Sequence, residues 1–496
     1  MITILLILLI LSTANVAAQT PDSASVERTT LWRTTEQPAW INPAIHKDAF
    51  HHSQSQIGIS FDFRNESKPF IQELGDRHVL PSIGVNTFLK LSEKTSVWGS
   101  VAYMNGTVKN ICWNSSTDYE LLKPYILADT IGGDTKKERY YFSGAYATEL
   151  KKIKLGAEIL FRAEHEYRDR DPRMRGIATD LTMRGGAARA WGKQIVGLAF
   201  EGNFYKQTNS VDFYNELGIS PEYQMTGLGT YYTRFSGDKR RLYFNGGGVS
   251  IEASTAPVSG NGVFADLLLK QRRYHRVLAD YNSMPLTDIY NESVSGNVGW
   301  KRERSTRTAF FIHAYHERRT GDERIGGKSE VNAYPTIGKL TMYISNATNA
   351  FASAIYGKGN WNAQAKAGYA NHQEEYVWPQ RKIEASHLFG ELNGQLFIAP
   401  SKPLTLRIDA MAAMAAGIDN KMEMPFADLS TGTTEYINHK YDFAKANYTT
   451  LQLGIRADHK LKDPRYGLFA SVNAGTVFCS ADATRVNLNI AIGATF

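Results

Sequence analysis

Two groups of side chains in the sequence have the types and spacing that could do chemistry, and the first is a pair of histidines. His313 and His316 form an H-x-x-H pair within the segment TAFFIHAYHER. On a helix this spacing could bind a metal ion, but on a strand positions i and i+3 point to opposite faces, so we predict no metal site. No H-E-x-x-H, P-loop or G-x-S-x-G sequence occurs in a usable context. We therefore predict neither a cofactor nor an enzymatic activity.

The second group is the densest charge cluster in the chain, YRDRDPRMRG at 167–176. Its basic members are Arg168, Arg170, Arg173 and Arg175, and aspartates stand between them. A guanidinium presents a planar fork of donors that suits anionic groups, so these four arginines are candidates for ligand binding on a loop. Exposed charges of opposite sign also pair at little cost, and a self-paired, solvated loop is the alternative.

The elements that must position these groups are strands, because strict alternation of apolar and polar residues recurs along the chain. In the last twelve residues, RVNLNIAIGATF, every second residue from Val486 to Phe496 is apolar. Similar stretches occur at 56–64, 153–163 and 387–398. They run for about 10 to 14 residues, above the usual mode of about 5 or 6, whereas a tilted strand that crosses a bilayer needs about 9 to 11.

The polar faces of these stretches carry charged residues in mid-strand. A sandwich core could not bury such charges cheaply, whereas a water-filled barrel lumen can hold them. The two signs are mixed, so the charges could line a polar permeation path or could pair with one another and block the interior. The candidates for lining the lumen are Lys154, Glu158, Arg162, Lys366, Glu391, Arg407, Asp409, Arg456 and Asp458.

Short and long connections alternate between the strands, as they do in outer-membrane barrels with short periplasmic turns and long extracellular loops. The long polar stretches that we expect to be loops include 65–79, 319–336 and 419–446. We predict a transmembrane antiparallel β-barrel over residues 53–496, with about 18 strands and with 14 or 16 as alternatives. The net charge of +7 is scattered along the chain and forms no basic stripe. We therefore expect contact with outer-membrane lipid and not with nucleic acid.

The N-terminal region indicates export. An apolar run at 1–11 is followed by the small residues Val16-Ala17-Ala18, which predicts a signal peptide over 1–18 and a location in the Gram-negative cell envelope. Residues 19–52 are then expected below the barrel in the periplasm or packed inside its lumen. An exported chain with an even number of cysteines allows a disulfide, here between Cys112 and Cys479.

The segment LWRTTEQPAWINPAI at 31–45, the long loops and the terminal Phe496 resemble bacteroidete-type outer-membrane β-barrel proteins of unknown function. The triplet Asn42-Pro43-Ala44 also resembles the start of long-chain fatty-acid transporter barrels, in which the segment before the first strand folds into the barrel as a hatch. Phe496 resembles the terminal aromatic signal of outer-membrane barrels, which implies the barrel-insertion machinery as a partner. The chain is too short for a TonB-dependent receptor, with about 22 strands and a plug domain, although it could accompany one.

Three functions remain open from the sequence. The first is a pore or an accessory transport subunit for polar solutes. The second is a closed structural or interaction barrel whose loops bind a surface lipoprotein, an uptake partner or a secretion partner. The third is a hydrophobic conduit similar to the fatty-acid transporters. A charged lumen favours the first two, whereas an apolar pocket beneath an N-terminal hatch would favour the third.

Overall fold

The structure of the protein is a computed structural model that describes residues 23–215, 217, 222–235, 240–281, 283–328, 334–425, 432–463 and 465–496. The predicted signal peptide, 1–18, lies outside the described residues. Within the described ranges, no helix combines the length and the apolar character needed to cross a membrane.

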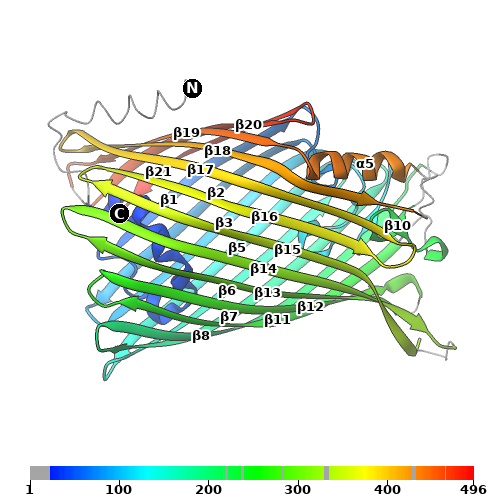
Figure 1. The fold of residues 1–496 in the computed structure, drawn as a ribbon, viewed down its shortest axis with the longest axis horizontal. Coiled ribbons are helices and arrows are strands. Elements are labelled where there is room, and N and C mark those ends of the chain that lie inside the picture. The colour runs from blue at the N-terminus through cyan, green and yellow to red at the C-terminus, as the bar shows by residue number, and fades with distance from the viewer. Residues whose placement is uncertain are drawn as a thin grey trace.

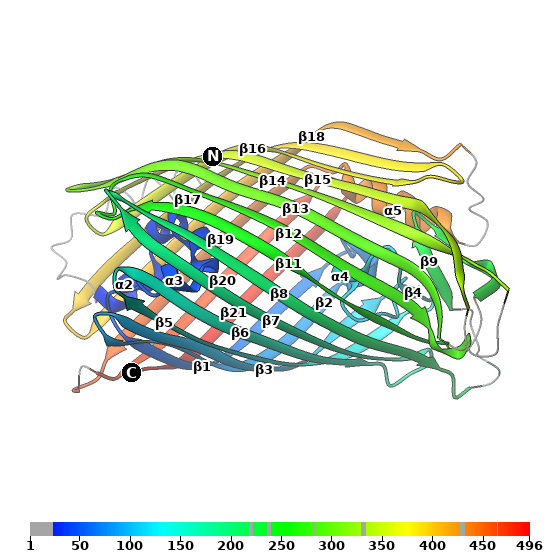
Figure 2. The same ribbon diagram turned by 90° about the horizontal axis from the view of Figure 1, so that it is seen from below.

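The fold is a closed antiparallel barrel of 18 strands, which confirms the predicted fold class and strand number (Figure 1, Figure 2). Each strand pairs with the next along the wall, and the first strand also pairs with the last, which closes the barrel. The strands are β1 (Gln54–Glu66), β2 (Arg77–Ser92), β3 (Thr95–Ile111), β5 (Gly133–Leu150), β6 (Ile153–Tyr167), β7 (Arg173–Trp191), β8 (Gln194–Asp212), β11 (Arg240–Pro257), β12 (Gly262–Leu278), β13 (Met284–Glu303), β14 (Thr306–Gly326), β15 (Thr336–Lys358), β16 (Trp361–Tyr376), β17 (Arg381–Ser401), β18 (Leu404–Glu423), β19 (Tyr448–Lys460), β20 (Gly467–Cys479) and β21 (Ala483–Thr495).

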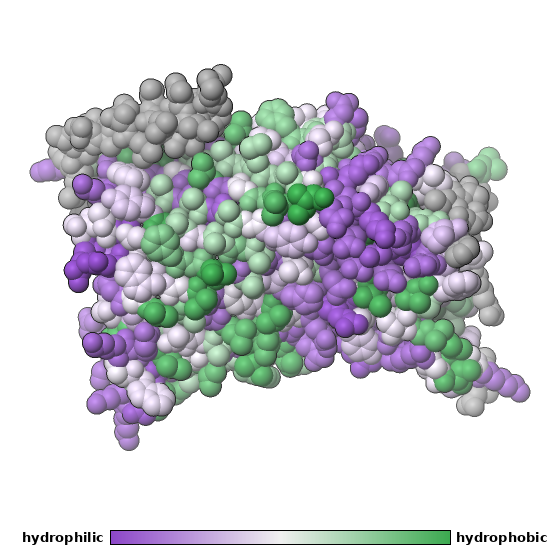
Figure 3. Space-filling view, viewed as in Figure 1, coloured by the Kyte–Doolittle hydropathy of each residue, from purple (hydrophilic) through white to green (hydrophobic). Residues whose placement is uncertain are grey.

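The alternating apolar side chains face outward, as the period of two requires once the other face encloses a polar lumen. Across the closing pair, Ile59 lies opposite Ile492, and these side chains are 55% and 57% exposed. Figure 3 shows such apolar residues gathered over one part of the outer wall.

The strands are longer than the sequence pattern predicts. They range from 13 residues in β1 to 23 in β15. On the outer face of β14, the apolar Phe310 and Ile312 give way to His316 and Arg318, and the strand continues to Gly326. The expectation of a long loop at 319–336 was therefore wrong over much of its length, because the strands extend beyond the apolar band with polar residues on their outer face (Figure 3, right).

Residues 23–52 lie inside the lumen near the end that holds Phe496, and we call them the N-terminal plug (Figure 1, dark blue). The plug contains α2 (Ser23–Thr29), η1 (Leu31–Thr35), η2 (Gln37–Ile41) and α3 (Pro43–His46). Its turns are capped locally: Thr30 Oγ1 accepts a hydrogen bond from the Trp32 amide, and Asn42 Oδ1 accepts one from the Ala44 amide, 3.0 Å away. The Asn-Pro-Ala triplet thus starts a helix, with an asparagine N-cap and proline in the first turn.

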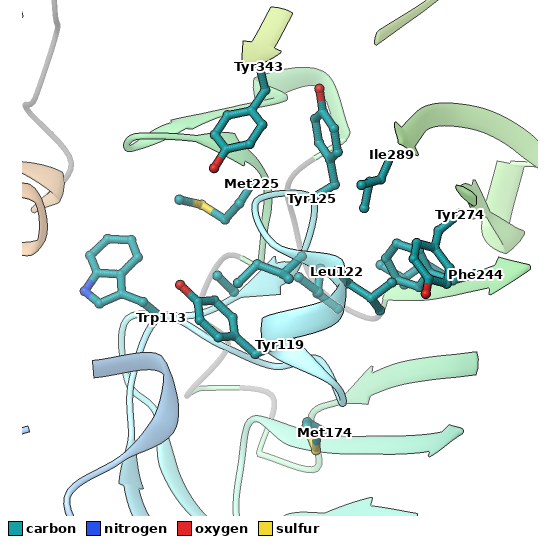
Figure 4. Packing of buried hydrophobic residues seen from close by; sticks show 14 of the residues in the cluster. Trp113, Tyr119, Leu122, Tyr125, Met174, Met225, Phe244, Tyr274, Ile289 and Tyr343 are labelled. Carbon is teal, nitrogen blue, oxygen red and sulfur yellow. The ribbon is translucent and has the colours of Figure 1, made fainter. Parts of the chain in front are cut away.

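The opposite end, which we call the mouth, is filled by segments that fold inward from the long connections. They are η3 (Gln72–Leu74), α4 (Tyr119–Leu122), β4 (Leu127–Ala128), β9 (Tyr223–Gly227), β10 (Thr230–Tyr231), η5 (Thr233–Phe235), η6 (Ala279–Tyr281) and α5 (Thr433–Ala444). β4, β9 and β10 form a small separate sheet. Several of these segments pack against the mouth ends of wall strands and bury a large hydrophobic cluster. The cluster includes Leu122, Tyr125, Phe244 and Tyr343 (Figure 4).

Candidate functional site

Two of the predicted lumen charges contact the N-terminal plug. Lys154 Nζ on β6 lies 2.5 Å from Asp48 Oδ2, and Asp458 on β19 accepts a hydrogen bond of 2.9 Å from Ser25 Oγ. Further polar contacts join the plug to β13, β16 and β17, so it is held from several sides of the wall. These are Lys301 Nζ to Glu36 Oε1 at 2.6 Å, Asn362 Nδ2 to Thr30 Oγ1 at 3.1 Å, and the Leu31 amide to Gln395 Oε1 at 2.8 Å.

The other predicted lumen charges also have partners. Arg162 makes a two-pronged contact of 2.7 Å with Asp118, the residue that precedes α4, so it joins the wall to the inward-folded segment at the mouth. The remaining pairs lie within the wall: Glu158 with Arg184 at 3.0 Å, Lys366 with Glu391 at 2.8 Å, Arg407 with Asp409 at 2.7 Å, and Arg456 with Asp458 at 2.8 Å. All nine predicted lumen residues are thus engaged with a charged or polar partner.

Three glycines of neighbouring strands form the surface on which α3 rests. A Cβ on Gly186 would lie 2.1 Å from Asn42 Oδ1, and one on Gly156 would lie 2.6 Å from the Pro43 carbonyl carbon. A Cβ on Gly197 would similarly meet the side chain of Ile45, at 2.7 Å. Because real Cβ atoms do not approach other atoms so closely, glycine is the residue that lets the plug lie against β6, β7 and β8.

Several aromatic side chains surround His46, the last residue of α3 in the plug. Its ring stacks on Trp40 at a centroid distance of 5.3 Å and lies 4.6 Å from the ring of Trp98 on β3. Burial, together with the positive charges of Arg184 and Arg28, lowers the pKa of His46 to about 4. The docked plug therefore holds this imidazole in its neutral form at neutral pH.

The four arginines of the predicted ligand-binding loop are not brought together into one site. Arg168 points inward, is 4% exposed and pairs with Asp129 at 2.7 Å. Arg173 pairs with Asp171 at 3.0 Å, while Arg175 lies 3.3 Å from a nitrogen of His165. Arg170 is exposed. Arg168 thus fixes the inward fold of the mouth, and the neighbouring charges pair locally, as in the self-paired alternative.

The disulfide that the sequence allows between the two cysteines is not formed. Cys112 and Cys479 are both free. Cys112 packs against the large cluster at the mouth and lies 3.5 Å from the Thr130 carbonyl oxygen, whereas Cys479 is buried in a separate cluster with Phe70 and Phe443. The two thiols belong to different packing groups.

His313 and His316 point to opposite faces of β14, as the strand period requires. His313 faces inward and pairs with Asn297 at 2.9 Å, whereas His316 is exposed beside Thr348. Within the described residues, no group of three or more histidine, cysteine, aspartate or glutamate side chains could hold a metal ion.

A cavity of about 660 Å³ opens at the mouth, between the large cluster and the wall near the closing strands. Acidic, basic, aromatic and aliphatic side chains line it. Its lining includes Phe70, Glu73, Tyr119, Lys123, His372, Glu374, Tyr436, Lys440, Tyr448 and Arg485. The cavity is thus built from η3, α4, α5 and the mouth ends of β16, β17, β19, β20 and β21.

Hydrogen bonds fix the polar groups on one side of this cavity. The buried carboxylate of Glu73 accepts hydrogen bonds from the hydroxyls of Tyr119, at 2.7 Å, and Tyr436, at 2.5 Å. Burial and the nearby Glu73 carboxylate raise the pKa of both tyrosines well above the usual value, so both hydroxyls stay protonated as donors. Lys440 Nζ lies 2.7 Å from Glu374; burial lowers the lysine pKa, but the Glu374 and Glu73 charges outweigh this effect and raise it.

Sequence reasoning missed this cavity. Its walls come from segments at 65–79 and 419–446, which were expected to be long polar loops, and no local signal joins them. A helical spacing was present in α5, where Tyr436, Ile437 and Lys440 share one face and turn toward the barrel interior.

The comparisons with solved structures give low similarity over most of the chain. A mutant of the ferric enterobactin receptor PfeA from Pseudomonas aeruginosa is 9% identical, with a TM-score of 0.40, and the match covers 90% of this chain and 81% of the receptor. The siderophore receptor PiuA from Acinetobacter baumannii is 6% identical, with a TM-score of 0.41, and the match covers 90% of this chain and 82% of the receptor. The copper transporter OprC is 6% identical, with a TM-score of 0.43, and the match covers 88% of this chain and 63% of the transporter. Nothing about a ligand follows from resemblance at this level.

No curated protein matches the sequence significantly. A family profile, by contrast, matches the whole barrel and part of the plug, from residue 43 to residue 496. The chain belongs to this family, which is described as "Family of unknown function (DUF6850)".

Proposed function

We propose that the protein is a non-enzymatic outer-membrane barrel that acts as a plugged, accessory transport barrel for a small polar solute. An outer wall with an apolar band around a charged lumen suits a bilayer crossed by strands, and in a Gram-negative cell that bilayer is the outer membrane. Outer-membrane barrels have short turns on the periplasmic side and long connections on the outer side. The mouth, which holds the long connections, would then face the exterior, and the plug would lie at the periplasmic end.

The observation that carries the proposal is the way the plug is held. It meets β13, β16, β17 and β19 through ion pairs and hydrogen bonds, among them Lys301 to Glu36 and Ser25 to Asp458. Each such contact contributes about 1 kcal/mol net, because water replaces the lost partner when the contact opens. The plug also buries apolar side chains against the wall, such as Trp32 beside Phe264 and Phe311. Its release would therefore need the free energy of a binding partner as well as the exchange of these polar contacts with water.

The chemistry of the passage favours a polar solute over a lipid. The mouth cavity combines charged and tyrosine groups such as Glu73 and Lys440, and the lumen below it carries paired charges of both signs. A solute with its own hydrogen-bonding groups could exchange partners along such a surface. The cavity also has apolar lining such as Phe70 and Ile383, but a fatty acid that passed it would meet the paired charges of the lumen, so we rank the hydrophobic conduit below the other two functions.

The test is single-channel conductance in a planar bilayer. The full mature protein is expected to be silent, or nearly so, whereas a variant that lacks residues 23–49 should show steady ohmic openings. Circular dichroism of both proteins provides the control that the barrel has formed. Steady openings of the full protein, equal to those of the deletion variant, would contradict a resting plug.

A silent deletion variant would also overturn the proposal, and it would favour a closed interaction barrel. One observation supports a closed interaction barrel. The large buried cluster joins α4 and α5 to the mouth ends of wall strands from β7 to β17. A mouth sealed by buried hydrophobic residues does not open cheaply. The outer loops would then serve to bind a surface lipoprotein or a TonB-dependent receptor, and neither partner is specified by the geometry.

A further inference from the structure

An open groove lies on the outer wall, where the apolar band ends toward the mouth. It has a volume of about 520 Å³ and is formed by β11, β12, β13 and β14. Figure 3 shows this kind of change from apolar to hydrophilic residues across one face of the outer wall. The apolar lining of the groove includes Val249, Ile251, Leu269 and Val294, and its polar lining includes Gln271, Glu292, His316 and Arg318.

One charge in this groove has no counter-ion in the protein. Arg318 points to the same side of β14 as Phe310 and Ile312, because even numbers of residues separate them. It is exposed, and it forms no ion pair within the residues that the structure describes. Glu292, opposite Arg318 in the ladder, accepts a hydrogen bond of 3.2 Å from Gln271. A cation on the lipid face is costly at the middle of a bilayer and costs little near its surface, where lipid headgroups lie.

Next to the groove, on the side of the mouth, basic side chains surround one aspartate. Asp288 on β13 lies 2.7 Å from Arg324 and 3.6 Å from Arg273, and it also contacts His275 and Lys339. The side chain of Asp288 is fully covered, whereas those of Arg273 and Lys339 are 44% and 35% exposed. One carboxylate does not balance three permanent positive charges. The surface above it therefore presents hydrogen-bond donors.

Arg273 connects this cluster to the groove. It lies two positions from Gln271 on the same face of β12, and its guanidinium lies over the ring of Tyr290, 4.9 Å from the centroid. Asp322, another acid beside the cluster, accepts a hydrogen bond of 2.7 Å from the Thr341 hydroxyl. The groove and the cluster thus form one continuous surface over β11 to β15.

The charges of this surface differ from those at the mouth ends of β17 and β18. There, Lys382 pairs with Glu384 at 2.7 Å, and Lys421 pairs with Glu423, so each lysine has a carboxylate of its own. Among the described residues around the groove, three acids serve four permanent cations and two histidines. They are Asp288, Glu292 and Asp322, beside Arg273, Arg318, Arg324 and Lys339, with His275 and His316.

We propose that this surface binds a phosphorylated, acylated lipid of the outer leaflet. Its phosphate would lie between Arg318 and Arg273, because a guanidinium presents a planar fork of donors that matches phosphate oxygens. One acyl chain would lie along Ile251, Leu269 and Val294. The inference rests on the position of the barrel in the outer membrane with its mouth outward, and it does not depend on transport.

Both halves of the surface are needed to explain the choice of occupant. A free phosphate ion would gain nothing from the apolar half, and a neutral lipid would gain nothing from the excess of basic groups. Glu292 is the one acid in the groove itself, and it should oppose an anionic headgroup. Removing its charge should therefore strengthen binding, which a merely structural role of the groove would not produce.

The experiment is native mass spectrometry of the full mature protein in detergent, titrated separately with diphosphoryl lipid A, phosphatidylethanolamine and inorganic phosphate. The wild type should bind one molecule of lipid A at least tenfold more tightly than phosphatidylethanolamine, and an equal concentration of inorganic phosphate should not displace it. Arg273→Gln and Arg318→Gln should each weaken the binding of lipid A about fivefold, and Glu292→Gln should strengthen it. Arg302→Gln is the matched control, because Arg302 is an exposed arginine at the opposite end of β13, and its variant should bind as the wild type does.

Four results would overturn the proposal. Equal affinity of the wild type for lipid A and phosphatidylethanolamine would indicate an unspecific lipid belt, and displacement by inorganic phosphate would indicate a site for a free anion. Wild-type affinity in the Arg273→Gln/Arg318→Gln double variant, or an equal loss in Arg302→Gln, would show that these arginines do not form the site. The comparison of lipids on the wild type decides the question even if a variant fails to fold. Because no conductance is measured, failure of the lipid site and failure of the proposed transport function can be told apart.

Discussion

The seat of α3 allows a sharp test of how the plug is held. Replacing Gly186 with alanine adds one methyl group to the lumen face of β7, 2.1 Å from Asn42 Oδ1 and 2.9 Å from Pro43 Cδ. Neither atom is the end of a long side chain, because Asn42 caps α3 and Pro43 begins it. The plug must therefore shift as a unit or leave its seat.

The expected size of the effect follows from overpacking. Adding a methyl group to a tightly packed place costs about 1 to 3 kcal/mol. The displacement also stretches the Asn42 hydrogen bond to the Ala187 carbonyl oxygen, already 3.4 Å long. If the whole cost falls on docking, the equilibrium between seated and released plug shifts toward release by about 5- to 100-fold, since about 1.4 kcal/mol is a factor of ten.

The neighbouring glycine supplies the matched control. A Cβ on Gly185 would have no atom within 4 Å, so Gly185→Ala makes the same chemical change on the same strand without touching the plug. Hydrogen exchange of the amides in residues 40–49 reports the seating of the plug. Gly186→Ala should lower their protection by about 5- to 100-fold, and Gly185→Ala should leave it unchanged. Equal protection in the two variants would refute the idea that glycine is needed at this contact.

Three further predictions concern the mouth, the pH response and the thiols. Arg168→Met removes the cation that pairs with the buried Asp129 and should lower the free energy of unfolding by about 3 to 5 kcal/mol. The same change at the exposed Arg170 should alter the free energy of unfolding by no more than about 0.5 kcal/mol. Denaturant unfolding in detergent compares the two variants, and equal effects would contradict a stabilising role for the buried Arg168–Asp129 pair. Burial and two arginines lower the pKa of His46 from 6.5 to about 4, so as the pH falls the released plug binds a proton before the docked plug does. Docking should therefore have its full stability above pH 6.5 and should weaken as the pH falls toward 4. Tryptophan fluorescence should follow this change, and His46→Phe should abolish it. A reducing agent should leave the thermal unfolding temperature unchanged because both thiols are free, and a clear decrease would indicate a disulfide.

The sequence was sufficient to predict the wall because alternation is a local property. The period of two determines which side chains face the lipid, and the inward placement of Lys154 and Arg407 follows from it. The extension of the strands beyond the apolar band was missed, because alternation is lost where both faces are polar. In β14 the residues after His316 keep pairing in the ladder, although their composition is that of a loop.

The mouth and the charge pairing could not be predicted for a different reason. The cavity forms where α4, α5 and η3 meet, and these segments are far apart in the sequence. Glu73 receives hydrogen bonds from Tyr119 and Tyr436, and no spacing in the chain encodes that meeting. Whether a lumen charge is paired depends likewise on its neighbours in space, so the choice between an open and a blocked interior could not be made from residue types.

The plug also constrains the order in which the molecule can be assembled. It precedes β1 in the chain, yet it makes polar contacts with strands as late as β19, where Asp458 receives the Ser25 hydroxyl. β1 in turn pairs with β21, so the ring around the plug closes only when the last strand is in place. The simplest route is for the plug to enter while the sheet is still an open, curved surface. In that case the plug becomes a template on which the last strands gather before the seam between β1 and β21 is sealed.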